Sequence, residues 1–331
     1  MQVSVHVLAR RGPAAATASL GHLRTCLPAG VRVRLVCDGA RDGTVEAVST
    51  AFPDVAVWQQ SDRRSPAGAH NRALRRAFSG AGDDAVLVLA EDARPEADFL
   101  PPLLEVMRWR PRAALVSPKI VLAGTRERIW YAGGRIDWWR GLPLHRGAGD
   151  PDDGRFDRPG PTDFATAVAM LVRSQAFDRV GPMDESRFNL LHDVDWSLRA
   201  RRIGMEVHYQ PHSRVRYLTP GARDTRTEAT PSSPERVADE ADMPAGDAGM
   251  PAGDGAELAC ELGRRSALGS PLLRDPLVRS RLRLIAHHGR WYHWPTAGPR
   301  VAAEATQDVL RGWRQRGAPR SGPDPKAAPR R

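Results

Sequence analysis

The sequence is poor in cysteine and contains no long hydrophobic run. Its 331 residues include three cysteines, Cys26, Cys37 and Cys260. Their spacing matches no metal-ligand motif, and an odd, sparse set argues against a disulfide framework. No run approaches the roughly 18 apolar residues that a membrane-spanning helix needs, and residues 1–6 lack the charged and then apolar layout of a signal peptide. These absences predict a cytoplasmic protein.

Lysine is also scarce, because the chain has only Lys119 and Lys326, and arginine supplies nearly all of the positive charge. The net charge of +10 predicts anionic partners: nucleotide phosphates, an acidic membrane surface or nucleic acid. The chain lacks a nucleic-acid recognition motif and its arginines are spread along it, which argues against nucleic acid. No Gly-x-Gly-x-x-Gly follows the first predicted strand, which argues against a Rossmann dehydrogenase.

Residues 1–119 alternate between strand-like and helix-like patterns. This alternation predicts an α/β fold with a mostly parallel sheet flanked by helices. Ligands bind outside the carboxyl ends of the strands in such sheets, and Asp38 and the pair Glu91–Asp92 follow two of these ends. The expected strands are 3–8, 31–37, 55–58, 85–89 and 113–116, and the expected helices are 14–27, 44–52, 67–78 and 97–109.

The region 120–163 changes to glycine, tryptophan and arginine with turn signals. It is too polar and glycine-rich for a core element and too aromatic for a linker, so we expect an ordered binding loop. Beyond it the pattern predicts a buried strand, a helix and two short closing strands, over residues 164–173, 174–180, 206–209 and 215–218.

The C-terminal third has three parts. Residues 219–263 are rich in Pro, Ala, Gly and Asp and can bury little apolar surface, which predicts disorder. The tail 317–331 also predicts disorder. Between them, 275–288 predicts a basic amphipathic helix followed by tryptophans. This combination fits a membrane-surface helix and equally a helix that packs back onto the domain.

Two groups of carboxylates stand out along the chain. Asp193 and Asp195 open a predicted helix that becomes strongly basic and ends at Gly204. A helix dipole favours acids at its start and bases near its end, so a capped surface helix also explains this segment. The second group, Glu91 and Asp92, directly follows an apolar strand. Carboxylates that converge from two distant segments meet the needs of a metal–nucleotide site or a general base.

The order of these motifs resembles family 2 glycosyltransferases. The motifs are Asp38–Thr44 after a strand, the acidic pair after the fourth strand, and His-Asp-Val-Asp-Trp-Ser-Leu-Arg from residue 192. The resemblance spans roughly residues 3–218, is strongest over 129–141 and 164–204, and points to the bacterial rhamnosyltransferase-like branch. It implies a GT-A fold and an inverting transfer from a nucleotide-diphosphate sugar to a glycan, a lipid-linked or a cell-envelope polysaccharide acceptor.

The resemblance also implies a domain layout. Residues 1–218 form the GT-A domain, with a nucleotide-binding half over 1–119 and an acceptor and catalytic half over 120–218. A linker over 219–263, a basic helical extension over 264–316 and the tail complete the chain. The expected partners are the donor and acceptor and, through 275–294, the inner face of the membrane; nucleic acid is not expected.

By this resemblance, Asp193 is the general base that takes the proton of the acceptor hydroxyl. Asp92 is the ligand of a divalent cation, Mg²⁺ or Mn²⁺, that holds the donor diphosphate. Glu91 matches the first acid of the family's Asn-Asp-Asp, although a solvated loop acid explains it equally well. Thr166 matches an element that lines the sugar pocket, with Ala167 where glycine is usual.

The remaining candidates each have a structural alternative. Asp38 or Asp42 contacts the nucleotide base or ribose, but for Asp42 a simple helix cap is favoured. Trp138 and Trp139 either stack on acceptor sugar rings or pack the loop. Asp195 is an acceptor-binding candidate, for which helix electrostatics is the favoured explanation.

Several family positions carry other residues in this chain. Together, these substitutions predict altered binding of the donor, metal independence with arginines in place of the cation, or lost activity. The alternative function is a catalytically impaired relative that binds a nucleotide sugar or glycan, or scaffolds a partner. The substitutions are Cys37 for aspartate, Ala90 for asparagine, His192 for the glutamate before the base, Tyr217 for a metal-ligand histidine, 8–10 for a Thr-Tyr-Asn-like segment and 63–65 for Asn-x-Gly.

Overall fold

The computed structural model describes residues 1–39, 42–60, 65–124, 127–185, 191–218 and 276–289. The chain divides into two compact units, Met1–Asp137 with Pro143–Asp254, and Trp138–Leu142 with Gly255–Arg331. The predicted disordered segments 219–263 and 317–331 lie outside the described residues, as does most of 264–316. In the ranges that are described, no helix is both long and apolar enough to cross a bilayer.

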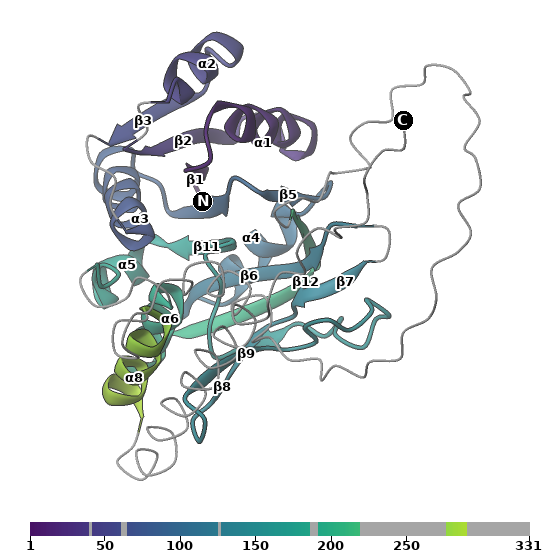
Figure 1. Ribbon diagram of the computed structural model, residues 1–331, viewed down its shortest axis with the longest axis vertical. Coiled ribbons are helices and arrows are strands. Elements are labelled where there is room, and N and C mark those ends of the chain that lie inside the picture. Colours follow the sequence, from purple (N-terminus) through teal and green to yellow (C-terminus); the bar gives the residue numbers. More distant parts are fainter. Residues whose placement is uncertain (40–41, 61–64, 125–126, 186–190, 219–275, 290–331) are drawn as a thin grey trace, which may run out of the picture. The chain divides into compact units, whose positions relative to one another are not determined.

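The amino-terminal half of the first unit is a parallel α/β arrangement (Figure 1). Strand β1 lies between β2 and β4 and pairs with both in parallel, and β3 pairs in parallel with β2. At Gly12, φ is 98°, a conformation that glycine adopts without a steric cost, and Pro13 at the first helical position starts α1. The elements are β1 (Val3–Ala9), α1 (Pro13–Cys26), β2 (Arg32–Asp38), α2 (Thr44–Ala51), β3 (Ala56–Gln60), α3 (Pro66–Arg75) and β4 (Ala85–Ala90).

The other half of the sheet is mixed. Within the described residues the strand order is β10-β12-β6-β11-β4-β1-β2-β3. Strand β11 (Ala169–Arg173) runs antiparallel to both of its neighbours, β4 and β6, whereas β12 (Glu206–Tyr217) runs parallel to β6 (Ala113–Leu122). The sheet is therefore less parallel than the alternation of the first 119 residues predicted. The apolar pattern of a buried strand is the same in a parallel and in an antiparallel sheet, so the sequence does not indicate the direction of the strand.

The prediction of a binding loop over 120–163 was wrong in part, because this region contains short strands. Ile129 and Tyr131 are fully buried, and β7 extends the main sheet by pairing with β6. The glycines reflect close packing: a Cβ on Gly134 would collide with the ring of Phe164. The strands are β7 (Arg128–Tyr131), β8 (Gly134–Asp137) and β9 (Leu142–His145), which form a two-stranded sheet, and β10 (Gly160–Pro161).

Three other boundaries differ from those expected. The two closing strands are one strand, β12, whose pairing with β6 shifts register between Gln210 and Arg214, around a proline that cannot donate to the ladder. The strand expected over 164–173 begins only at Ala169. Helix α3 ends at Arg75, and a π-helical turn, Arg76–Gly80, follows it.

One face of the main sheet carries the buried cluster that supports the site. Trp196 of α6 (His192–Arg202) is fully buried in it, and its indole N–H donates to the Gly181 carbonyl at 2.7 Å. The cluster joins residues of β1, β2, β4 and β11 to α3, α5 (Ser174–Val180) and α6. The remaining elements of this unit are β5 (Ala93–Pro95), which pairs with β12, and α4 (Leu100–Trp109).

The second unit contains helix α8 (Pro276–His288), close to the helix that the sequence predicted. Leu284 and Ile285 of this helix are fully buried. Arg281 is also buried, and it donates hydrogen bonds to the carbonyls of Arg140 and Gly141 at 3.0 and 3.3 Å.

Candidate functional site

The register of the three central strands brings charged residues to one edge of the sheet. Ala9 at the end of β1 lies opposite Cys37 of β2, and Leu8 lies opposite Ala90 of β4. The residues that end or follow these strands are therefore neighbours. We call them the strand-end cluster: Arg10, Arg11, Asp38, Glu91 and Asp92.

Contacts within the strand-end cluster join all three strands. The backbone N–H of Arg10 donates to Oε1 of Glu91 at 3.0 Å. The Arg10 guanidinium lies 3.6 Å from Oδ2 of Asp38, and that of Arg11 lies 3.3 Å from Oδ2 of Asp92. The hydroxyl of Tyr217 also hydrogen-bonds to the Asp92 carboxylate. Sequence reasoning noted Arg10 only as a departure from the family and overlooked Arg11.

Both acids that follow β4 lie in surroundings that disfavour their charged forms. Burial raises the pKa of Glu91 to about 7, against the opposing effect of the Arg10 backbone N–H. Burial also raises the pKa of Asp92, and the Arg11 charge opposes that rise. Glu91 is only 4% exposed, and its Oε2 has no hydrogen-bond partner. The alternative that Glu91 is a solvated loop acid is therefore wrong.

Asp193 lies half-buried in the first turn of α6. Its Oδ2 accepts the backbone N–H of Ala167 at 2.9 Å, and its Oδ1 accepts that of Val194 at 2.9 Å. The Val168 carbonyl, one residue beyond Ala167, accepts the N–H of Ala90 at 2.9 Å. The segment 166–168 thus ties the start of α6 to the end of β4, next to Glu91 and Asp92. Thr166 of this segment is 5% exposed.

A pair of buried histidines joins α3 to the start of α6. The rings of His70 on α3 and His192 stack, with centroids 5.8 Å apart and planes 28° apart. His192 is buried and neither of its ring nitrogens has a hydrogen-bond partner. Burial lowers the pKa of His70 to about 3 and lowers that of His192, and the Arg10 charge adds to both effects. Burial therefore disfavours the charged form of both imidazoles, and Arg10 is close enough to influence their pKa values.

The sequence gives no sign of the His70–His192 contact, because the two residues lie 122 positions apart on different helices. Cys37, in the place of the family's aspartate, is fully buried. Burial raises the pKa of its thiol to about 11, and nearby carboxylates add to the rise. The thiol is therefore uncharged and cannot do the work of a carboxylate.

Two predicted site residues have structural contacts. Oδ1 of Asp42 accepts from the backbone N–H and the hydroxyl of Thr44, at 3.2 and 2.6 Å, at the start of α2. The N-cap residue of this helix is Gly43, and not Asp42 as the sequence had predicted. Asp195 is 3% exposed and accepts from Arg199 at 2.9 Å. Arg199 also donates to the carbonyls of Val180 and Pro182, so Asp195 joins α6 to the end of α5 and offers little surface to an acceptor.

The tryptophans predicted to bind the acceptor belong to the second unit. Trp139 is 53% exposed. Trp138 is partly buried. Their roles in acceptor binding stay predictions.

The residues around Asp92 were tested for their fit to a divalent cation. Its carboxylate is contacted by the guanidinium of Arg11 and the hydroxyl of Tyr217, which are hydrogen-bond donors. A divalent cation requires several oxygen ligands and is repelled by a neighbouring guanidinium. In the described part of the chain, no group of three or more His, Cys, Asp or Glu side chains is arranged to hold a metal. This set of residues does not fit a divalent cation.

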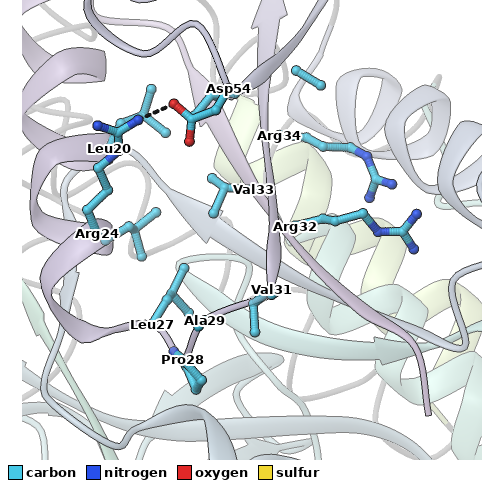
Figure 2. A pocket seen from close by; sticks show the side chains of 14 residues that line it. Leu20, Arg24, Leu27, Pro28, Ala29, Val31, Arg32, Val33, Arg34 and Asp54 are labelled. Carbon is cyan, nitrogen blue, oxygen red and sulfur yellow. Dashed lines mark hydrogen bonds and ion pairs between the residues drawn. The ribbon is translucent and has the colours of Figure 1, made fainter.

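A separate hollow of about 550 Å³ lies at the opposite edge of the sheet, where β2 and β3 begin (Figure 2). It is lined by Arg24 of α1, by Arg32 and Arg34, which extend from the same side of β2, and by Asp54. Asp54 pairs with Arg24. None of the predicted site residues lines this hollow, so it is distinct from the strand-end cluster.

The chain was compared with known proteins. A family model described as glycosyltransferase-like family 2 matches residues 21–234. N-acetylglucosaminyl-diphospho-decaprenol L-rhamnosyltransferase of Mycobacterium tuberculosis, in strains CDC 1551 / Oshkosh and ATCC 25618 / H37Rv, is 26% identical over 203 residues. The match covers 56% of this chain, and the chain spans 66% of the length of that relative.

Two solved structures are also similar. GalNAc-T7, crystallised with UDP, GalNAc and Mn²⁺, has a TM-score of 0.54 at 16% identity, over 66% of this chain and 44% of that one. Mannosyltransferase PcManGT from Pyrobaculum calidifontis, in complex with GDP-Man and Mn²⁺, has a TM-score of 0.47 at 16% identity, over 95% and 80% of the two chains. The first likeness agrees with the GT-A fold of the main sheet. The chain belongs to the glycosyltransferase-like family 2.

Proposed function

We propose that this chain is an inverting glycosyltransferase that moves a sugar from a nucleotide-diphosphate donor to a hydroxyl of a glycan or lipid-linked acceptor. The observation that carries the proposal is the position of Asp193. It is half-buried, oriented by two backbone N–H groups, and tied through 166–168 to the edge that holds the strand-end cluster. A candidate base and a pair of arginines therefore share one edge of the sheet.

In the proposed reaction, Asp193 is the general base. Each of its carboxylate oxygens accepts one backbone N–H and keeps a further lone pair for the acceptor hydroxyl. The acceptor oxygen forms a bond to the anomeric carbon while the bond from that carbon to the diphosphate breaks. The electron pair leaves with the diphosphate, and the hydroxyl proton passes to Asp193. Attack from the face opposite the leaving group inverts the anomeric centre.

Other predicted residues have supporting roles in this proposal. Asp38, Glu91, Asp92 and Thr166 line the donor side, and Asp42 holds the start of α2 beside it. Trp138 and Trp139 supply aromatic surface for the acceptor, and Asp195 keeps α6 in place. The predicted divalent cation takes no part in the proposed reaction, because the surroundings of Asp92 do not fit one.

The acceptor class follows from the curated relative. Its name specifies an N-acetylglucosaminyl-diphospho-decaprenol substrate and L-rhamnose transfer, which supports a lipid-linked acceptor and a rhamnose-like donor sugar here. A polyprenol-linked acceptor is held at a membrane surface. We therefore propose a cytoplasmic enzyme that binds the inner face of the membrane, and residues 275–294 are its predicted contact.

The test is Asp193→Asn in the full chain, assayed for sugar transfer with a panel of nucleotide sugars. We expect the rate to fall by about 10²- to 10⁴-fold while the donor still binds. Asp178→Asn, an exposed residue on α5, makes the same charge change and should leave the rate unaltered. An unchanged rate in Asp193→Asn would refute the assignment of the base. Donor binding without turnover in the wild-type chain would instead favour the catalytically impaired alternative.

A further inference from the structure

On the basis of the proposed function, we propose that Arg10 and Arg11 bind the diphosphate of the donor and take the place of a divalent cation. The two residues follow β1 directly, at the edge where the strand-end cluster gathers. Arg10 lies near Asp38 at the end of β2, and Arg11 lies near Asp92 after β4. The site would therefore bind a nucleoside diphosphate through protein cations alone.

The ion pair of Arg11 is loose enough to be exchanged for a ligand. The guanidinium of Arg11 lies 3.3 Å from Oδ2 of Asp92, a distance longer than the 2.7–2.9 Å typical of charge-assisted hydrogen bonds. The Arg11 side chain is 44% exposed and that of Arg10 is 26% exposed. An incoming diphosphate can therefore reach both guanidinium groups from solvent.

The turn after the arginines adds positive potential. Gly12 leads directly into α1, which has 14 residues, no side-chain cap on its first turn and no acid within that turn. The backbone N–H groups at such a start, together with the helix dipole, favour anions. The first turn of α1 contains no acid of its own, although Oδ2 of Asp42 lies 3.5 Å from the position that a Cβ on Gly12 would take.

A buried polar atom also indicates a missing ligand group. Oε2 of Glu91 has no hydrogen-bond partner although the residue is only 4% exposed, and its other oxygen accepts from the Arg10 backbone. An unpaired buried oxygen costs free energy, and a hydroxyl of the donor would remove that cost by donating to it. The unsatisfied acceptor therefore lies directly beside the proposed diphosphate site.

The chemistry of the leaving group suits guanidinium ions. As the bond to the anomeric carbon breaks, negative charge develops on the diphosphate, and arginine can donate two parallel hydrogen bonds to phosphate oxygens. This role explains two substitutions together. Tyr217, where the family has a metal-ligand histidine, donates to Asp92, and Asp92 in turn holds Arg11. Asp92 is then a positioning residue for Arg11 and not a metal ligand.

The test is calorimetric binding of inorganic pyrophosphate, and of UDP, GDP and dTDP, to the full chain in EDTA and in excess Mg²⁺. We expect at least one of these ligands to bind in EDTA with a Kd within about threefold of that in Mg²⁺. Arg11→Ala should weaken this binding about 10- to 100-fold, and Arg11→Lys should restore part of it. Arg24→Ala, at the other end of α1, removes the same charge and should leave binding unaltered.

Asp92→Asn distinguishes the arginine site from a metal site. If Asp92 positions Arg11 and holds no metal, this variant should change the Kd of pyrophosphate by the same factor in EDTA and in excess Mg²⁺. Binding that requires Mg²⁺, persists in Arg11→Ala and is lost in Asp92→Asn would overturn the inference while leaving the proposed transferase intact. Absence of binding to every probe under both conditions, in a chain with an intact circular-dichroism spectrum, would overturn both proposals.

Discussion

The two ends of the central strands carry the same residue types but hold them differently. At the amino-terminal end, Asp83 is 2% exposed and accepts from Ser4, Arg32 and Arg34 at 2.8, 2.6 and 2.7 Å. At the carboxyl end, Arg10 and Arg11 remain at 3.6 and 3.3 Å from their carboxylates. The first group is a closed hydrogen-bonded network, whereas in the second the Arg11–Asp92 pair is longer than a charge-assisted hydrogen bond.

This difference separates structural charges from functional ones. Arg34 also lies over the Trp58 ring, at 4.9 Å from its centroid, so its guanidinium already has a carboxylate and an aromatic partner. The hollow in Figure 2 is lined by this arginine and by Arg32, yet both are bound to Asp83. Because Arg32 and Arg34 are already paired, we regard this hollow as a weaker candidate for an anion site than the edge that holds Arg11.

Asp83→Asn should give the largest change in stability. Removing this carboxylate charge leaves Arg34 buried without its counter-ion, which costs about 3–5 kcal/mol of the free energy of unfolding. Urea denaturation measures the loss, and pyrophosphate binding at low temperature should persist. The neighbouring Asp84, whose side chain is 60% exposed, supplies the control: Asp84→Asn should cost under about 1 kcal/mol. Equal losses of stability in the two variants would show that the hydrogen bonds of Asp83 do not stabilise the amino-terminal end of the sheet.

Glu91→Gln should give a smaller effect that depends on pH. The pKa of Glu91 is raised from 4.5 to about 7, so the folded chain binds more protons between these values and loses stability as the pH rises through them. The amide does not titrate. Relative to the wild type, the free energy of unfolding of the variant should therefore increase between pH 4.5 and 7, by up to about 3 kcal/mol. Above pH 7 this difference should not change further. Stability curves that stay parallel over this range would contradict the buried position of Glu91.

The smallest effect is expected for Arg24→Ala. Its ion pair with Asp54 is exposed, with 49% and 68% of the two side chains accessible, so water and salt screen it. The loss of stability should be about 0–1 kcal/mol and should shrink further in high salt. A loss of stability comparable with that of Asp83→Asn would mean that the residues lining the hollow in Figure 2 form a second network that stabilises the fold.

The fold of the first 119 residues could be predicted because local patterns encode it. Apolar strands such as β4 alternate with helices whose starts are marked by Pro13, by Asp42 and by Ser65, which accepts from the Gly68 N–H at 3.2 Å. The strands between residues 120 and 163 escaped prediction because their glycines serve side-chain packing, as Gly134 does against Phe164. That contact depends on the tertiary structure.

The candidate site was predictable in its acids but not in its cations. Asp193 and Asp92 stand at positions where sequence motifs and element ends coincide. The pairing of Arg11 with Asp92 depends on the register of β1 against β4, and no local pattern specifies that register between strands so far apart in the chain. The stacking of His70 on His192 likewise depends on how α3 and α6 pack.

The most direct test of the account is a crystal structure of the full chain with the nucleoside diphosphate that stabilises it most against heat, grown in EDTA. A ligand that binds the folded state raises the melting temperature, so a thermal screen selects the nucleotide. We predict that its diphosphate contacts Arg10 and Arg11 at the carboxyl end of β1, within reach of Asp193. A diphosphate bound in the hollow beside Arg24, Arg32 and Arg34 would contradict the account.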